Sequence, residues 1–442
     1  MVSTAAFLSF AAKPDTGDTA WVLASAALVL LMTPGLAFFY GGMVRGKNVL
    51  NMLMMNFITM GIVGVLWVLV EYSLAFGDGN AIIGDLYHWK LNHTTGLWTG
   101  YTIPVVVFVM FQAMFAIITP ALWTGSIADR LRFVPFVAIV VLWSLLVYAP
   151  VAHWVWASNG WLFKLGAEDF AGGTVVHANA GAAGLALAIV LGKRKGWPKE
   201  PMRPHNLPFV LLGAGLLWFG WFGFNAGSAL GANGLAGLAF TTTSTATSAA
   251  MLGWVIVEKI RDGHPTTLGA ASGAVAGLVA VTPACGFITP LGSIVLGLIA
   301  GAVCAMATGL KFRFGYDDAL DVVGVHLVGG VLGALLIGFL GSSKANKAYA
   351  DGLLYGGGPG LLGKQAAAVG ASVGYSFVMT LIIAYVVKAV FKGLRVDEET
   401  EVEGLDINLH AETAYETLTG AGLRASSPSV STTPKAGAEV SA

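Results

Sequence analysis

The chain has 442 residues, of which 56% are hydrophobic and only 11% are charged, against about 25% charged residues in ordinary soluble domains. Its formal net charge is zero, so the overall charge gives no indication of a nucleic-acid partner. This composition excludes an ordinary soluble domain and is typical of a polytopic membrane protein.

The N-terminal residues 1–12, MVSTAAFLSFAA, are too short to cross a bilayer and lack the basic start of a good signal peptide, although a remnant of one is an alternative. Eleven apolar runs follow, each long enough to cross about 30 Å of hydrocarbon. Lipid cannot hydrogen-bond a bare backbone and the runs lack the alternation of barrel strands, so we expect helices. The runs lie near residues 20–42, 48–72, 103–126, 132–152, 172–192, 207–228, 235–257, 266–283, 286–310, 322–342 and 366–391.

The basic residues predict the orientation of these helices. The loops after every odd-numbered run, together with the C-terminal tail, hold 18 of the 24 Lys and Arg residues. Because basic loops stay in the cytoplasm, we expect residues 1–19 outside the membrane and the C-terminus in the cytoplasm. The domain from 20–392 is then followed by a cytoplasmic region, 393–423, and by a Ser/Thr/Pro/Ala-rich tail, 424–442, that we expect to be disordered.

Two histidines occupy matching places in the fifth and tenth runs. His177 lies in DFAGGTVVHANAGA and His326 in DDALDVVGVHLVGG, and each follows an aspartate, Asp169 or Asp318, by eight residues. The first and sixth runs also end alike, in GLAFFYGGMVRG and GWFGFNAGSALG. We therefore expect a five-plus-five inverted repeat with one extra helix, and the two histidines near the midplane, where such repeats place a substrate path.

Each of these features also has a structural explanation. A histidine on an apolar helix is often a hydrogen-bonded packing residue, but within a bilayer an ionisable residue usually lines a pathway. Helix capping explains the aspartates that precede the two histidine helices, because a carboxylate there accepts hydrogen bonds from the helix N-terminus. These aspartates are Asp169 before His177, and Asp317, Asp318 and Asp321 before His326. The two cysteines, Cys285 and Cys304, are 19 residues apart, roughly 28 Å along a helix, so we read them as packing residues rather than a disulfide.

Aromatic residues gather near the predicted outer ends of three runs. Phe111 and Phe115 are one helical turn apart, Trp156 ends the fourth run, and the sixth contains the stretch WFGFNAGS. Such residues often form interfacial belts or cores, but ring faces can also hold a monovalent cation, and a serine hydroxyl can accept an N–H bond from it. The pattern therefore suits a small nitrogenous cation that must shed water.

These motifs together resemble the ammonium transporter family (Amt/Mep/Rh), and the Amt branch of prokaryotic type in particular. The similarity covers about residues 20–418 and includes TPGLAFFYGGMVRGKNVL, FQAMFAIITPALWTGSIADR, DFAGGTVVHANAGAAG and DDALDVVGVHLVGG. It implies an eleven-helix fold assembled as a homotrimer, with one pore in each subunit and no cofactor. It also implies a possible cytoplasmic partner, a P-II signal protein that blocks the inner face.

The resemblance also implies roles for individual residues. It assigns an outer ammonium recruitment site, a gate, a pore lining with a proton relay, and two structural or electrostatic carboxylates. The outer recruitment site consists of Trp156, Phe111 and Ser228, and the gate consists of Phe115 and Phe224. The pore lining with the proton relay consists of His177, His326 and Trp221. The structural or electrostatic carboxylates are Asp169 and Asp318.

The mechanism expected from these residues begins with binding and deprotonation of ammonium, which then crosses the apolar pore as ammonia. If the proton follows along the two histidines, transport moves net charge, which we favour; if it returns outside, the protein is an electroneutral gas channel. An ammonium sensor or scaffold is a further alternative. An intramembrane enzyme is not favoured, because no nucleophile or HExxH motif accompanies the histidines.

Overall fold

The computed structural model describes residues 13–415, and within this range the chain is helical, with three isolated β-bridges and no β-strand. The expectations for residues 1–12 and 416–442 lie outside the described residues. The α-helices are α1 Thr16–Met43, α2 Val49–Leu66, α3 Tyr72–Phe76, α4 Val105–Trp123, α5 Phe133–Trp143, α6 Ala149–Trp156, α7 Trp161–Leu165, α8 Asn179–Leu191, α9 Leu207–Gly227, α10 Gly234–Asp262, α11 Thr267–Val281, α12 Pro290–Ala307, α13 Leu310–Phe314, α14 Val328–Leu340, α15 Gly360–Val390, α16 Glu398–Glu403 and α17 Leu405–His410.

Every predicted apolar run coincides with helical structure. In residues 13–415, nine helical segments are long and apolar enough to cross a membrane. The runs 235–257 and 266–283 correspond to α10, which carries the polar stretch TTTSTATS, and to α11, which has only 15 residues. Helices α1 and α10 begin before the predicted runs, because capping residues and not hydrophobicity set where they start: Asp15 caps the N-terminus of α1 and Asn233 that of α10.

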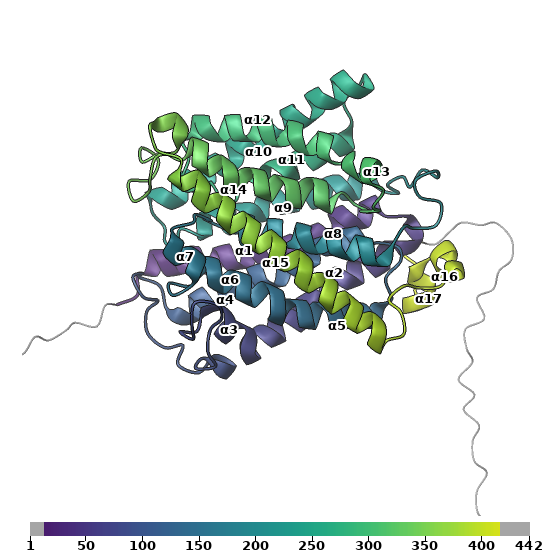
Figure 1. Ribbon diagram of the computed structural model, residues 1–442, viewed down its shortest axis with the longest axis horizontal. Helices are drawn as coiled ribbons and strands as arrows, with labels where there is room; N and C mark the ends of the chain where they lie inside the picture. The colour runs from purple at the N-terminus through teal and green to yellow at the C-terminus, as the bar shows by residue number, and fades with distance from the viewer. Residues whose placement is uncertain (1–12, 416–442) are drawn as a thin grey trace, which may run out of the picture.

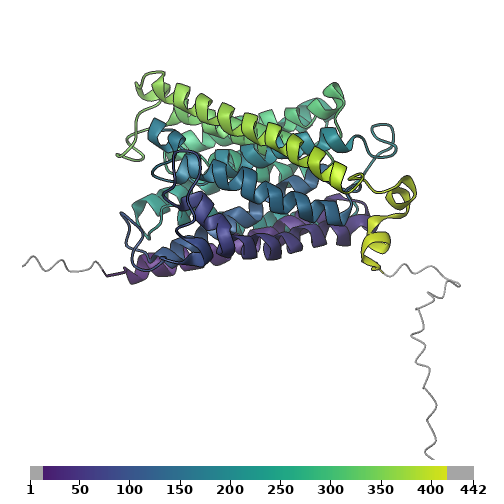
Figure 2. The ribbon, with the colours of Figure 1, turned by 60° about the horizontal axis from the view of Figure 1, so that its bottom comes forward.

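The long helices lie side by side along the longest axis of the molecule, as Figures 1 and 2 show. One end holds α7 and the start of α1, and the opposite end holds α13, α16 and α17 (Figure 1). We call these the α7 end and the α16 end. The described N- and C-terminal residues therefore lie at opposite ends of the helical bundle.

Helices α1 and α9, which carry the two similar sequence motifs, pack against each other at very short range. A Cβ atom added at Gly213 would lie 2.3 Å from the backbone nitrogen of Phe39, and one added at Gly220 would lie 2.3 Å from Cγ of Met32. Small residues allow membrane helices to approach this closely and to gain van der Waals contact. Gly213 and Gly220 thus allow the close contact between the helices that begin the two sequence halves.

Four of the helical segments widen locally into π-helix: η2 Trp67–Glu71, η5 Ser144–Tyr148, η6 Gly173–Ala178 and η7 Val323–Leu327. His177 lies in η6 and His326 in η7. The extra residue of a π-turn redirects side chains and is frequent at functional sites. The matching positions that the two histidines have in the sequence are therefore also matching positions in backbone structure.

The cysteines are buried and free, as expected for packing residues. Cys285 follows α11 and Cys304 lies in α12.

Candidate functional site

A chamber of about 1230 Å³ opens at the α7 end of the bundle. Its wall includes residues from the first two thirds of α4, from the end of α6, from the segment that follows α9 and from other segments between helices. Three residues of the predicted outer site and gate, Trp156, Ser228 and Phe115, line it, and so do Gln112, Glu168 and Asp169. The structure therefore brings together three predicted residues that are up to 113 positions apart in the sequence, Phe115 and Ser228 being the most distant.

Trp156 and Ser228 each have one polar atom engaged with the backbone. The indole nitrogen of Trp156 donates to the carbonyl oxygen of Asp169 at 3.0 Å, which fixes the ring at the chamber wall. The Ser228 hydroxyl donates to the carbonyl oxygen of Phe224 at 2.8 Å. Because a hydroxyl has one hydrogen and two lone pairs, Ser228 remains free to accept a hydrogen bond from a cation in the chamber.

Phe111, the third residue of the predicted outer site, is fully buried and is not among the chamber-lining residues of the described chain. Its ring meets the ring of Phe115 edge-on, with centroids 4.9 Å apart. In this structure Phe111 therefore supports Phe115 from behind.

A continuous column of rings leads from the chamber into the bundle. Phe115 meets Trp156 at 5.8 Å and Phe224 at 4.2 Å between centroids. Phe224 is 6.0 Å from His177, and the rings of His177 and His326 meet edge to edge, with centroids 5.4 Å apart and an interplanar angle of 19°. A smaller hollow of about 40 Å³ begins at the other end of the column, where His326, Tyr40 and Asp321 line it. The column thus separates two hollows and fills the space between them with apolar faces and imidazoles.

Trp221 fixes the orientation of His177 within this column. Its ring lies parallel to the imidazole, with centroids 5.2 Å apart and an interplanar angle of 20°. Its indole nitrogen donates to the hydroxyl of Thr282 at 2.8 Å, so the indole has no hydrogen left for the histidine. Trp221 therefore acts on His177 by stacking alone.

The hydrogen bonds around the two histidines define their protonation pattern. The Tyr40 hydroxyl has a single hydrogen and donates it to the carbonyl oxygen of Leu122 at 2.9 Å. The longer contact from Tyr40 to Nε2 of His326, at 3.4 Å, then requires that Nε2 of His326 carry a hydrogen. A neutral His326 has an acceptor at Nδ1, which lies 3.3 Å from Nδ1 of His177.

His177 must consequently donate through Nδ1, which leaves its Nε2 as an acceptor. This atom is buried and has no hydrogen-bond partner among the described residues. A buried acceptor without a partner is costly and is often retained for function. The pair therefore offers one vacant lone pair, on the member closer to the gate ring Phe224.

Asp169 is held by the start of the helical segment that contains His177. Its two carboxylate oxygens accept hydrogen bonds from the backbone nitrogens of four consecutive residues, Gly172 to Val175, at 2.7–3.0 Å. This is the arrangement of a helix-capping carboxylate, placed where the helix dipole is positive. Asp169 thus orients the backbone that carries His177 and has little capacity left for a ligand.

Asp318 has the corresponding position before His326. It accepts a hydrogen bond from the backbone nitrogen of Val323 at 2.7 Å and one from the hydroxyl of Ser126 at 2.8 Å. Its neighbours differ from the capping expectation, because Asp317 binds Arg194 and Asp321 pairs with Lys311. A buried arginine next to Asp317 competes more strongly for the carboxylate than a helix terminus does.

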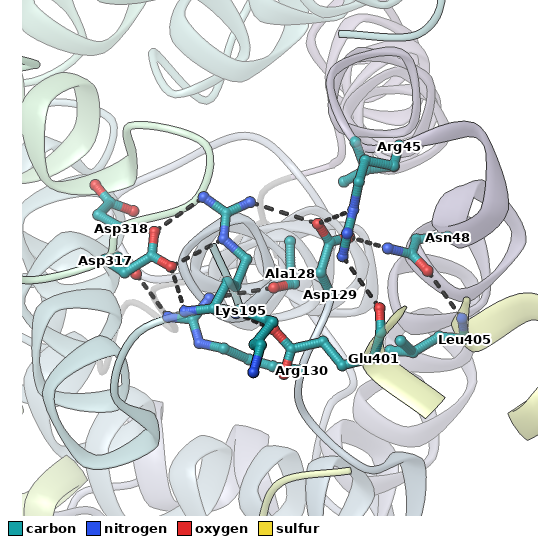
Figure 3. A network of polar contacts seen from close by, with 12 residues as sticks. Arg45, Asn48, Ala128, Asp129, Arg130, Lys195, Asp317, Asp318, Glu401 and Leu405 are labelled. Atoms are coloured by element: carbon teal, nitrogen blue, oxygen red, sulfur yellow. Dashed lines mark hydrogen bonds and ion pairs between the residues drawn. The ribbon is translucent and has the colours of Figure 1, made fainter. Parts of the chain in front are cut away.

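A network of buried charges lies near the α16 end (Figure 3). Arg194 donates to both carboxylate oxygens of Asp317 at 2.9 Å and contacts Asp129 at 3.4 Å, and Arg45 donates to Asp129 at 3.2 Å. Burial opposes ionisation of Asp317, but the hydrogen bonds and charge of Arg194 outweigh it and hold the Asp317 pKa below its usual value.

The segment after α15 docks on this network. Asn48 donates to Asp129 at 2.5 Å and accepts from the backbone nitrogen of Leu405 at 2.8 Å, as Figure 3 shows. Asp406 accepts from the backbone nitrogens of Leu50 and Asn51 and so caps the start of α2. The first part of the tail therefore packs on the helical domain.

Sequence reasoning did not single out Tyr40, Arg194 or Asp129. Tyr40 lies in GLAFFYGG, which is similar to GWFGFNAG. The alignment of these two motifs places Phe39, the neighbour of Tyr40, at the position of Phe224, and this similarity was the available indication that Tyr40 lies near the pore. Arg194 and Asp129 lie in two different basic loops with no spacing that indicates their contact, since 65 residues separate them.

Comparison with known proteins identifies the family. Residues 20–415 match the model described as the Ammonium Transporter Family. The chain is 54% identical to an ammonium transporter of Mycobacterium tuberculosis, with 92% of each chain covered, and 51% identical to one of Bacillus subtilis, with 90% and 98% covered.

Solved structures agree with this assignment. The crystal structure of Candida albicans Mep2 matches with a TM-score of 0.82 and 33% identity over 88% of each chain. A structure described as a sensor Amt protein matches with a TM-score of 0.82 and 30% identity, covering 89% of this chain and 98% of that one. The curated relatives are named as transporters and not as enzymes. The chain is a multi-pass membrane protein of the ammonium transporter family.

Proposed function

We propose that the protein carries ammonium across the cell membrane by binding the cation in the chamber, removing its proton and passing ammonia along the ring column. The observation that supports this most directly is the column itself, which lies between two hollows and consists of Phe115, Phe224, His177 and His326. Its lining offers aromatic faces and one vacant nitrogen acceptor and no charged side chain among these rings. Such a passage suits a small neutral molecule with N–H donors.

Selection against potassium follows from this lining. Ammonium and potassium carry the same charge, so attraction into the chamber does not distinguish them. Moving a bare monovalent ion through an apolar passage costs several kcal/mol or more, whereas a neutral molecule avoids that cost. Ammonium can become neutral by losing a proton and potassium cannot, so the column rejects potassium.

Recruitment in this proposal uses Trp156, Phe111 and Ser228. The Trp156 ring and the free lone pairs of Ser228 face the chamber, and together they replace part of the cation's hydration; a cation over a ring face gains about 0.5–2 kcal/mol. Phe111 contributes by holding Phe115. Phe115 and Phe224, whose centroids are 4.2 Å apart, form the gate that opens by side-chain rotation.

The proton travels in this proposal along the histidines, so that transport moves net charge. His177 accepts a proton at its vacant Nε2 and passes the proton it already carries at Nδ1 to Nδ1 of His326, 3.3 Å away. His326 then releases its Nε2 proton into the smaller hollow that it lines. Each ring returns to one proton after each step, so neither stays charged in the apolar interior. Asp169 and Asp318 hold the two backbone segments that position the rings.

The proposed architecture has eleven transmembrane helices in a five-plus-five inverted repeat plus α15, with the α7 end outside and the α16 end in the cytoplasm. Matching π-turns at His177 and His326, and the basic loops at the α16 end, support it. The subunits form a homotrimer with a pore in each.

The test is the current that an ammonium pulse evokes across proteoliposomes that contain the purified protein. We expect a saturable current with ammonium and none with potassium. His177→Ala should abolish the current or its selectivity, whereas His264→Ala, at an exposed loop position, should leave both unchanged. A change of internal pH without current would replace the relay with an electroneutral ammonia channel, and no transport above protein-free liposomes would reject the proposed function.

A second candidate, ammonium sensing, is favoured by two observations. A protein described as a sensor Amt protein matches over 89% of this chain, and the tail segment docks through Asn48 and Asp406 on loops at the end opposite the chamber. A cytoplasmic protein of the P-II type could read that surface. Pull-down of such a protein that changes with ammonium in wild type, and persists in a transport-dead variant, would support sensing.

A further inference from the structure

Glu168 is a carboxylate of the chamber wall that the proposed transport mechanism does not use. It precedes the capping residue Asp169 and lines the chamber with Trp156. Its backbone is clamped by one side chain of α15: Gln365 accepts from the backbone nitrogen of Glu168 at 2.6 Å and donates to its carbonyl oxygen at 2.7 Å. The position of the residue is therefore rigid, whereas its carboxylate has no hydrogen bond to any described residue.

The charge composition of the chamber makes this free carboxylate significant. The chamber wall includes four acidic residues, Asp18, Asp78, Glu168 and Asp169, and no lysine or arginine among the described lining residues. Asp169 is saturated by four backbone N–H groups, and Asp18 accepts from Thr102 and from the backbone of Ala232. Of the remaining two, Asp78 is exposed, whereas Glu168 is partly buried and lies next to the residue that fixes Trp156.

Three groups face Glu168 from the elements packed around it. Lys364 of α15 lies close to its loop, with Nζ 3.0 Å from the position of a Cβ atom added at Gly166, and its charge acts on Glu168. Tyr349, whose pKa burial and Glu168 raise to about 12, stays neutral at ordinary pH. Asp169 is the neighbouring carboxylate.

Burial raises the pKa of Glu168 to about 7, an effect that the positive charge of Lys364 partly opposes. Its ionised form therefore increases as the pH rises through neutrality. At such a pKa about one tenth of the molecules carry the charge at pH 6 and about nine tenths at pH 8.

We propose that Glu168 determines the affinity of the chamber for ammonium and that its ionisation makes recruitment depend on the external pH. Its negative charge raises the local concentration of cations beside Trp156 and Ser228, and a partly screened unit charge changes binding by roughly three- to tenfold. The residue acts before the cation loses its proton, so it affects the apparent KM and leaves the maximal rate unchanged. This inference rests on the proposed transport function.

The alternative role for Glu168 is a structural one, in which it forms a long-range pair with Lys364. The two roles predict different results for Lys364→Gln. In a structural pair, removing either partner has the same effect on stability and transport. If Glu168 recruits cations, removing the lysine raises the pKa of Glu168, shifts the pH transition upward and lowers the KM at alkaline pH, opposite to the effect of Glu168→Gln.

The experiment measures initial transport rates in proteoliposomes against ammonium concentration from pH 6 to pH 8.5, read as current or as internal pH. We expect the wild-type KM to fall roughly three- to tenfold across this range, because ammonium remains the dominant species while Glu168 becomes charged. Glu168→Gln should keep the high KM of the acidic range at every pH, and Glu168→Asp should restore the pH dependence. Higher salt should raise the wild-type KM at pH 8 more than that of Glu168→Gln.

Controls separate this effect from others in the same chamber. Asp78→Asn should change the KM less, because its exposed carboxylate is better screened, and Glu399→Gln, exposed on α16 at the opposite end, should change nothing. The lining residues His88 and His93 are the same in wild type and in Glu168→Gln, so they do not account for a difference between the two pH profiles. Equal pH profiles for wild type and Glu168→Gln, with transport intact, would overturn the inference; absence of wild-type transport would overturn the proposed function instead.

Discussion

Removal of the Asp317 carboxylate tests the buried charge network directly. Asp317 is 0% and Arg194 5% exposed in their side chains, and two parallel N–H bonds of 2.9 Å join them. Arg130 also lies against this site, since it donates to the carbonyl oxygen of Asp317 at 2.6 Å. In Asp317→Ala two guanidinium groups remain buried beside one carboxylate, that of Asp129.

The expected loss is large because an uncompensated charge stays buried. Breaking such a pair from one side costs about 3–5 kcal/mol. At about 2 °C per kcal/mol, the lower end for soluble domains of moderate size, the melting temperature should fall by roughly 6–10 °C. Replacing both partners with apolar residues, Asp317→Leu with Arg194→Met, should cost less than the single alanine substitution, since no charge is left without a partner.

The assay is thermal unfolding of the detergent-solubilised protein as a function of pH. The pKa of Asp317 is lowered in the folded protein, so its ionisation stabilises the fold above the ordinary carboxyl pKa and that contribution is lost as the pH falls through the folded value. The wild-type melting temperature should therefore approach that of Asp317→Asn only in acid, below about pH 4.

Two results would refute this reasoning. If water solvates the network, Asp317→Ala is harmless, and a melting temperature within about 1 °C of wild type at pH 7 would show that. A double variant less stable than the single one would show that packing, and not the unpaired charge, dominates.

Two other predictions concern packing and the tail. Gly333→Ala should destabilise the protein or prevent its assembly, because the added Cβ would lie 1.9 Å from the carbonyl oxygen of Ala280. Gly374→Ala in α15, where an added Cβ has no atom within 4 Å, should be neutral or stabilise the protein by about 0.5–1 kcal/mol. Thermal unfolding compares the two variants. Asp406→Ala should remove the cap of α2 at a cost of about 0.5–2 kcal/mol and should speed limited proteolysis after residue 394. The control Glu399→Ala should do neither. Equal cleavage rates for the two variants would contradict the docking role of Asp406.

The sequence was most informative where one physical property acts alone. Length and hydrophobicity locate the helices, and even α10 was recognised despite its threonines, because its apolar residues continue through residue 257. The repeat at His177 and His326 predicted that the histidines meet, and their nitrogens are 3.3 Å apart. Side-chain roles at the outer site remain predictions from resemblance, and Phe111 illustrates the limit, since helical spacing from Phe115 does not reveal which ring faces the chamber.

What could not be predicted depends on contacts between distant loops. Nothing in the spacing of Asp317 and Arg194 indicates a pair, because 123 residues separate them and each loop also offers other charges. Capping was expected at Asp317 from its place before a helix, and the arginine overrides this local preference. The π-turns that carry the histidines have no signature in hydrophobic periodicity.

The hydrogen bonds of Tyr40, His326 and His177 form a series in which all donors have the same direction. Every donor points the same way, from His177 toward the Leu122 carbonyl. A proton that enters at one end and leaves at the other reverses all the bonds it crosses, so a second one cannot follow until both rings have exchanged their tautomers. In the proposed relay, both rings must return to their starting tautomers after every proton, and the time needed for that return sets an upper limit on the turnover rate.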